Sequence, residues 1–378
     1  MKKLVVMYSE NRDNPKNTWS GTSYSLRKAL EKNFDIIFID LHEGKVLRLL
    51  DLLSIQIGKK YRSYIVGPLH DLLLQVKAKW LLRKYKNIPV LEIANEVKIR
   101  NPYYLYQDLS LVVLPEIQSR MKKKGFTSCG GLRMELSDQE LERKIDVQKK
   151  IYFSVDKAFF MGKWVEHKMK DIYPEISEKF LAVGGGINSE FINNGDEDNV
   201  TQYRNIVFVG IDFERKGGPL VVEAFRIVQR KIANAKLIIV GPEKKEIQEK
   251  IGRNNKNIEI LGNVNRKELS DIFRNAALFC MPSEFEAYGL VFPEAMGFGI
   301  PCIGRNSYEM KYFIQDNKNG YLLDSDNAED LAQIICRALN NKKMKYDVEQ
   351  QENQIRKTYS WNRVANEIWK EVNKKGQI

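Results

Sequence analysis

Short runs of Val, Ile, Leu and Phe alternate along this chain with longer segments whose apolar residues recur at helical spacing. Such runs, bounded by polar or turn residues, are typical of buried strands, and the segments between them are typical of helices. We predict strands at residues 3–8, 35–40, 63–66, 89–93, 109–114, 157–161, 180–183, 205–209, 235–240, 258–261, 278–281, 301–304 and 320–323. We predict helices at residues 23–32, 72–84, 218–232, 266–275, 289–297 and 328–340. The alternation indicates an α/β protein with two doubly wound, Rossmann-like parallel sheets, one in each half of the chain.

A polar, turn-rich stretch at residues 188–204 separates the two halves and reads as a linker. Three glycines shortly before it, at 184–186, form either a hinge or a tight turn after a strand. Residues 359–374 carry apolar side chains on related faces, and we expect this C-terminal helix to cross back to the N-terminal domain. The predicted domains are therefore 1–188 together with 359–378, and 189–358.

Composition narrows the class of protein. The chain has 378 residues, of which 43% are hydrophobic, and this suffices for two globular domains. No apolar stretch is long enough to span a bilayer, and the apolar run that begins at Leu4 is too short for a signal peptide. The four cysteines and three histidines are scattered, so we expect a reducing, cytoplasmic compartment and no metal site.

The net charge of +12 implies an anionic partner, which could be a nucleic acid, a membrane or a phosphorylated ligand. No RNA- or DNA-binding module is recognisable, so we do not expect a nucleic-acid partner. Residues 72–86 combine Leu73, Val76 and Trp80 with several lysines and arginines. This segment is either a peripheral contact with the inner face of an anionic membrane or a surface helix with solvated charges.

The segment 281–304 offers the clearest candidate chemistry. A strand ends at Met281, a loop follows, and a helix begins near Gly289, at the edge where open parallel sheets bind ligands. Unpaired N–H groups at a helix N-terminus suit a diphosphate. Glu286 lies in the loop and Glu294 one turn into the helix, and carboxylates accept hydrogen bonds from vicinal hydroxyls. Taken singly, Glu286 reads more readily as a solvated loop residue, and Glu294 as an N-terminal acid favoured by the helix dipole. Their spacing within strand, loop and helix is what favours a binding role.

A second segment, 205–225, has the same strand–loop–helix layout. Gly210 follows the strand, and Arg215 and Lys216 precede the glycine that opens the helix. Two adjacent cations at a strand's carboxyl end can neutralise a leaving diphosphate. The alternative for the pair is a solvated basic loop.

Together, these segments resemble the retaining glycosyltransferases of the large GT-B-fold family usually numbered four. The acidic motif of that family has two glutamates with Gly-Leu between them, and it appears here from Glu286 to Glu294. Three further segments resemble sequences common in that family: the loop Gly210…Lys216-Gly217, the turn Gly262-Asn263 and the segment Tyr359-Ser360-Trp361. One departure is Ile211, since the family commonly has an arginine there.

The resemblance implies roles for these residues. Glu294 would hold the ribose hydroxyls, and Glu286 would hold the transferred sugar. Arg215, next to Lys216, would take the role of the arginine that the family has at the position of Ile211. The resemblance also assigns donor contacts to a further set: Gly21, Thr22, Asn263, Val264, Tyr288, Gly289 and Leu290. The polar N-domain residue that faces the sugar stays unassigned, because His70 has the wrong spacing and Asn95 and Glu96 lie nearer the expected position.

We therefore predict a GT-B enzyme with two domains facing across a cleft, the N-terminal one binding the acceptor and the C-terminal one the nucleotide-sugar donor. The donor is a substrate, so no cofactor is expected. The implied chemistry transfers a sugar with retention to a glycan or lipid-linked acceptor, in cell-surface polysaccharide or glycoconjugate synthesis. Three alternatives remain: an inactive glycosyltransferase-like scaffold that partners an active enzyme, a nucleic-acid-binding protein, and another GT-B enzyme such as an epimerase or phosphorylase.

Overall fold

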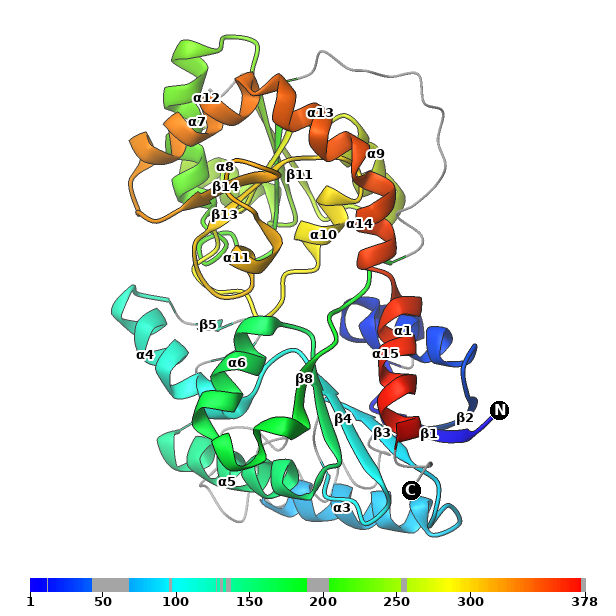
Figure 1. Ribbon diagram of the computed structural model, residues 1–378. Coiled ribbons are helices and arrows are strands. Elements are labelled where there is room, and N and C mark those ends of the chain that lie inside the picture. Colours follow the sequence, from blue (N-terminus) through cyan, green and yellow to red (C-terminus); the bar gives the residue numbers. More distant parts are fainter. Residues whose placement is uncertain are drawn as a thin grey trace. The chain divides into compact units, whose positions relative to one another are not determined.

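The structure is a computed structural model (Figure 1). It describes residues 1–11, 13–42, 68–94, 97–126, 128–129, 132–133, 137–188, 204–252 and 257–374. The chain divides into two compact units: unit 1 is Met1–Gly186 with Trp361–Ile378, and unit 2 is Ile187–Ser360. The strand predicted at 63–66, Asn95 and Glu96, and most of the predicted linker lie outside the described residues.

Unit 1 is built on a six-stranded parallel sheet with the order β2-β1-β3-β4-β7-β8. The strands are β1 (Lys3–Tyr8), β2 (Asp35–Asp40), β3 (Val90–Ile93), β4 (Tyr103–Gln107), β7 (Lys157–Phe160) and β8 (Phe180–Ala182). All residues of β3 and β4 are buried, as expected of parallel strands covered on both faces. The strand order reverses between β1 and β3, and ligands of doubly wound sheets bind at the carboxyl ends of strands beside such a reversal.

The helices of unit 1 include the C-terminal one. They are α1 (Thr22–Leu30), α3 (Pro68–Leu82), α4 (Leu114–Lys123), α5 (Asp138–Ser154), α6 (Lys163–Ile172) and α15 (Trp361–Lys374). Short 3-10 helices are η1 (Pro15–Gly21), η3 (Leu111–Val113) and η4 (Pro174–Lys179). A small antiparallel hairpin consists of β5 (Ser128–Cys129) and β6 (Leu132–Arg133). Helix α15 lies beside α1, where the Asn33 amide donates a hydrogen bond to Asn366 over 2.9 Å (Figure 1). A side chain at Gly186 would collide with the Trp361 ring at 2.5 Å, so the start of α15 packs tightly on this unit.

The strand predicted at 109–114 is wrong. The true strand is the preceding run of tyrosines, β4, and the apolar residues after it form η3 and the start of α4. The Ser110 hydroxyl accepts a hydrogen bond from the Val112 N–H, and Pro115 occupies the first turn of α4. A capping serine and an early proline both favour a helix start, and they outweigh the β-branched residues between them.

Unit 2 is a second six-stranded parallel sheet with the order β11-β10-β9-β12-β13-β14. The strands are β9 (Asn205–Val209), β10 (Lys236–Val240), β11 (Ile258–Gly262), β12 (Leu278–Cys280), β13 (Cys302–Arg305) and β14 (Gly320–Leu323). Numbered one to six in chain order, these strands lie in the order 3-2-1-4-5-6, which is typical of dinucleotide-binding sheets. The strand order reverses between β9 and β12. The two predicted parallel sheets are thus confirmed.

The helices of unit 2 connect these strands and lie outside the sheet. They are α7 (Gly218–Lys231), α8 (Lys244–Ile251), α9 (Arg266–Arg274), α10 (Val291–Met296), α11 (Met310–Phe313), α12 (Ala328–Asn340), α13 (Lys342–Gln350) and α14 (Glu352–Thr358). Helices α7 and α12 lie side by side (Figure 1). Across the described parts of both units, no helix has the length and apolar character needed to cross a bilayer.

Candidate functional site

Two loops of unit 2 meet where the strand order reverses. The first follows β9 and runs through Lys216 to α7, and the second follows β12 and runs through Glu286 to α10. Because β9 and β12 are hydrogen-bonded neighbours, their carboxyl ends bring both loops to one point of the sheet edge. The two segments that the sequence singled out therefore form one site.

The first loop depends on a glycine that touches the second. Gly217 caps α7 with a φ of +82°, and a Cβ there would lie 2.6 Å from the Pro282 carbonyl oxygen. Any other residue at this position would have to adopt the unfavourable left-handed conformation. Its Cβ would also collide with the Pro282 backbone, which cannot move aside. Two further backbone contacts join the loops: the Glu284 N–H donates to the Arg215 carbonyl over 2.8 Å, and the Ser283 hydroxyl lies 3.3 Å from the same oxygen.

Three charged side chains converge at this point. The Lys216 ammonium donates to the Glu286 carboxylate over 2.5 Å, and the Arg215 guanidinium lies 3.8 Å from the same oxygen. Glu286 and Arg215 are buried, and 17% of the Lys216 side chain remains exposed. Glu286 and Asp212 balance the two cations, so the charge here is local rather than net. Ammonium and guanidinium donors beside the opening of α7 suit a phosphate group.

Arg215 is fixed from two further directions. Its Nε donates to Asp212 over 2.9 Å, and its Nη1 donates to the Phe285 carbonyl over 2.5 Å. The guanidinium therefore faces Glu286 in a set orientation and cannot swing freely into solvent. Sequence reasoning missed Asp212, although its position three residues before Arg215 was a usable signal for an ion pair.

A buried ion pair supports the second loop from behind. The Arg305 guanidinium in β13 donates to Glu284 over 2.5 Å and to the Pro282 carbonyl over 3.1 Å. Both side chains are buried, and Arg305 also pairs with Asp326 over 2.6 Å, so the buried charges are compensated. No sequence motif predicts this pair, because Glu284 and Arg305 are twenty-one positions apart in the chain.

Glu294 lies in α10 and is buried. Burial raises the pKa of its carboxyl to about 8, against a lowering influence of the Arg266 charge. A carboxyl that is held partly protonated in an apolar setting is often found at functional sites. Hydroxyl groups of a ligand would supply the hydrogen bonds that favour its charged form.

The other predicted contacts of unit 2 lie around these loops. The Tyr288 ring is buried against Phe313 at 5.0 Å between centroids. A Cβ at Gly289, whose φ is +90°, would lie 3.2 Å from the Phe292 ring and 3.5 Å from Glu286, and Leu290 is the residue before α10. Asn263 and Val264 follow β11, after a Gly262 carbonyl that accepts a hydrogen bond from the Gly241 N–H over 2.7 Å.

Ile211 is the exception within the first loop. Its side chain is 78% exposed, directly after Gly210, where the resembling family commonly has an arginine. An apolar side chain exposed to this degree gains nothing from burial, and it cannot bind a phosphate.

Gly21 and Thr22 lie in unit 1, in the connection from β1 to α1. Trp19, Ser20 and Gly21 have φ values of 47°, 56° and 87°, and Thr22 is buried at the start of α1. Consecutive left-handed residues other than glycine are unfavourable and persist only where the surroundings impose them.

Asp108 contributes to those surroundings and was missed, because the preceding strand was misplaced. It follows β4 directly, and the Trp19 side chain donates a hydrogen bond to it. Burial raises the pKa of Asp108 to about 6, although the N–H groups of Asp108 and Leu109 and the Trp19 side chain counteract the rise. The Trp19 ring also packs edge-on against Tyr106 at 6.2 Å.

His70 lies in a helix of unit 1. It is buried in α3, with Nδ1 3.4 Å from the Asp71 carboxylate. Within the described residues, no group of three or more His, Cys, Asp or Glu side chains is placed to hold a metal ion.

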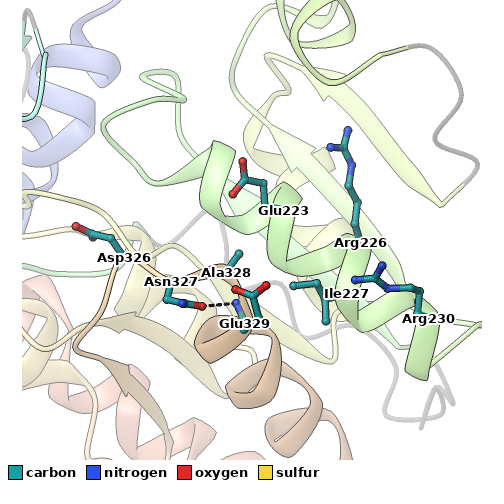
Figure 2. Close-up of a pocket in the computed structure, with 8 residues that line it drawn as sticks. All are labelled: Glu223, Arg226, Ile227, Arg230, Asp326, Asn327, Ala328 and Glu329. Atoms are coloured by element: carbon teal, nitrogen blue, oxygen red, sulfur yellow. Dashed lines mark hydrogen bonds between the residues drawn. The ribbon is translucent and has the colours of Figure 1, made fainter.

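Figure 2 shows a separate hollow of about 510 Å³ between α7 and the start of α12. Glu223, Arg226 and Arg230 line it from α7, while Asn327 caps α12 by accepting from the Glu329 N–H over 2.7 Å. It contains none of the predicted site residues, and its charges are mixed.

Comparison with known proteins bears on the family and the fold of this chain. Residues 192–361 match the family described as "Glycosyl transferases group 1", which is less than half of the chain but nearly all of unit 2. The structure resembles a sucrose-phosphate synthase from Thermosynechococcus elongatus, with a TM-score of 0.69 at 14% identity, over 100% of this chain and 99% of that one. The fold is GT-B.

Two further relatives are informative. Anabaena HepE, solved in complex with UDP and glucose, has a TM-score of 0.66 at 13% identity over 99% of this chain and 100% of that one. An uncharacterized glycosyltransferase from Methanocaldococcus jannaschii is 26% identical over 208 residues, which cover 54% of this chain and 56% of the relative. The chain spans about half the length of the curated relatives it matches. These findings support a transferase.

Proposed function

We propose that this chain is a glycosyltransferase that takes a sugar from a nucleotide-diphosphate donor bound at the two loops of unit 2. The observation that carries the proposal is the convergence of Arg215, Lys216 and Glu286 at the strand-order reversal. The segment that contains these residues is the one that matches the glycosyl transferases group 1 family. A ligand with two phosphates and a sugar would use both the cations and the carboxylates.

We assign the roles accordingly. Lys216 and Arg215 neutralise the diphosphate as it leaves, and Glu286 binds the transferred sugar. Glu294 accepts hydrogen bonds from the ribose hydroxyls. The backbone of Tyr288, Gly289 and Leu290 approaches the diphosphate, and the turn at Asn263 and Val264 faces the nucleobase. Preorganised charges of this kind stabilise the transition state because they need no reorganisation during the reaction.

We further propose that the enzyme belongs to the retaining family numbered four. The leaving diphosphate would assist attack by the acceptor on the same face of the sugar, so that no covalent nucleophile on the protein is required. The loop with Gly21 and Thr22 would contribute to donor binding from unit 1. The acceptor would be a glycan or a lipid-linked glycan in cell-surface polysaccharide or glycoconjugate synthesis, and a cytoplasmic location agrees with the free, buried thiols of Cys280 and Cys302.

The competing function is an inactive glycosyltransferase-like scaffold that partners an active transferase. Ile211 favours it, because the exposed isoleucine replaces a cation that would contact phosphate. Arg215 argues against it, since a guanidinium already faces Glu286 from the neighbouring position.

A thermal-shift panel of UDP, GDP, ADP and their sugars tests the donor site. A ligand that binds only the folded protein stabilises it by about 2.7 kcal/mol at a hundredfold excess over its Kd. We expect one nucleotide family to raise the Tm of the wild type and to lose this effect in Glu294→Ala. Donor hydrolysis should also disappear in Glu286→Ala. Binding without any turnover would favour the scaffold, and no shift at millimolar ligand would contradict the donor site.

A further inference from the structure

Helix α3 of unit 1 has two apolar faces. Leu74, Ala78 and Leu82 are 3%, 0% and 5% exposed and pack in the core. Leu72, Val76 and Trp80 are 58%, 56% and 58% exposed. The members of each set are four residues apart, and the two sets lie about 200° apart around the helix at 100° per residue. The second set therefore forms an outward stripe that the core does not need.

The helix is firmly held, so the outward stripe is not the result of loose placement. Asp71 binds Arg143 over 2.6 Å and Lys144 over 3.3 Å, both from α5. Burial raises the pKa of Asp71, but the His70 hydrogen bond and these two cations outweigh it and lower the pKa to about 2. Gln75 exchanges two hydrogen bonds with the backbone of Lys98, at 2.6 and 2.8 Å.

Cations flank the outward stripe. Lys79 and Arg83 are exposed and share its side of the helix, since they lie three residues from Val76 and Trp80 respectively. The Arg83 guanidinium lies 4.8 Å from the centroid of the Trp80 ring, a cation–π distance. In the described part of the chain, neither cation forms an ion pair with a carboxylate.

We propose that the outward face of α3 binds the surface of an anionic lipid bilayer. A narrow apolar stripe bordered by cations suits a helix that lies in the plane of the interface, with its apolar residues among the acyl chains and its cations at the headgroups. Tryptophan and arginine side by side are typical of that boundary. The net charge of +12 adds attraction over a longer range. This binding is independent of the transfer reaction and brings the enzyme to lipid-linked acceptors.

Vesicle sedimentation tests the proposal. The full chain is mixed with phosphatidylcholine vesicles that contain or lack phosphatidylglycerol, at low and high salt. We expect binding only to the anionic vesicles, weakened by salt. The triple variant Leu72→Ser/Val76→Ser/Trp80→Ser should lose it, whereas Tyr346→Ser, which removes a 60% exposed aromatic from unit 2, should retain it.

The cations are tested with a charge-matched pair of variants. Lys79→Glu/Arg83→Glu should weaken binding at least about tenfold, because each basic residue near the surface contributes several-fold to the partition coefficient. Lys244→Glu/Lys245→Glu makes the same change in net charge on exposed residues of α8 and should have a much smaller effect. Brominated lipids should quench tryptophan fluorescence in the wild type, and Trp80→Phe should remove that quenching.

Three outcomes would overturn the proposal. Equal binding to neutral and anionic vesicles would remove the role of charge, and full binding by the triple variant would move the contact elsewhere. Self-association in sedimentation velocity that the triple variant abolishes would assign the stripe to a second copy of the chain. The thermal shift by nucleotide, measured in every variant, shows separately whether the donor site is intact.

Discussion

The loops of unit 2 and the β1–α1 connection of unit 1 both lie at the carboxyl ends of parallel strands, but they are held by different interactions. In unit 2, side-chain charges and backbone contacts lock two loops together through Lys216, Glu286 and Arg215. In unit 1, the backbone takes three successive left-handed conformations, and Trp19 is fixed by Asp108 and Tyr106. A charge cluster can be recognised in a sequence by its residue types. An unusual backbone conformation at residues other than glycine has almost no such signal.

The comparison also separates two uses of buried charge. In unit 2 the charges of Arg215, Lys216 and Glu286 lie where the two loops meet, and we propose that a ligand binds there. In unit 1 the fully buried Glu92 accepts hydrogen bonds from the Tyr103 hydroxyl and from the Val97 N–H, the latter at 3.0 Å. We therefore expect charge removal in unit 2 to affect activity most and charge removal in unit 1 to affect stability most.

The largest effect is expected from Lys216→Ala. Loss of the cation beside the leaving diphosphate should lower kcat/KM by about 10²- to 10³-fold, the usual effect of removing one transition-state donor. Lys250→Ala is the matched control, because Lys250 also binds carboxylates but lies on the surface. Steady-state kinetics with the donor found in the thermal-shift panel measures both variants. Equal rates in the two would mean that Lys216 plays no part in the reaction.

Gly217→Ala should destabilise unit 2 strongly. Gly217 and Gly252 share a φ of +82°, but a Cβ at Gly252 meets nothing within 4 Å, whereas one at Gly217 meets the Pro282 carbonyl. Gly252→Ala should therefore cost only the strain of the left-handed backbone, about 1–2 kcal/mol. Gly217→Ala should cost about 1–3 kcal/mol more, the usual range for overpacking. Urea denaturation measures the difference, and similar midpoints would mean that the two loops are not in firm contact.

Tyr103→Phe tests the buried charge of unit 1. It removes a donor to the Glu92 carboxylate, and we expect a loss of about 1–3 kcal/mol in the free energy of unfolding. Tyr346→Phe, at an exposed site, should change nothing. Nucleotide binding should stay intact in both variants. A loss of nucleotide affinity in Tyr103→Phe without a loss of stability would contradict the division between the two units.

A slope of stability against pH is expected as well, with a modest effect for each single pH unit. The pKa of Glu294 is about 8 in the folded protein and near 4.5 when unfolded, so the folded state binds more protons between these values. Stability should therefore fall as pH rises through this window, by at most about 1.4 kcal/mol per pH unit. Asp108, with a pKa of about 6, contributes to the same fall in stability mainly below pH 6. Between pH 6 and 8, Glu294→Gln should flatten the slope in denaturation curves, and an unchanged slope would assign it to another group.

The sequence by itself determined the two parallel sheets and most of their strands, because buried parallel strands leave continuous apolar runs that need no tertiary knowledge to read. β1, β2, β9 and β14 match the predicted bounds residue for residue. The acidic motif and the basic pair could be predicted as well, since each lies within a few residues of a strand end. The prediction failed at 109–114, where local capping by Ser110 outweighed an apolar composition that fits a strand equally well.

Only the tertiary structure decided which residues meet. Lys216 and Glu286 are seventy positions apart, and Arg305 and Glu284 twenty-one, so their pairing depends on which strands are neighbours in the sheet. The raised pKa of Asp108 arises from its burial, and the Trp19 side chain contacts Asp108 and Tyr106, which are distant in sequence. The outward stripe of α3 became visible only when the packing showed which of two apolar faces the core uses. Periodicity reports that a residue is apolar, and burial depends on what the rest of the chain places against it.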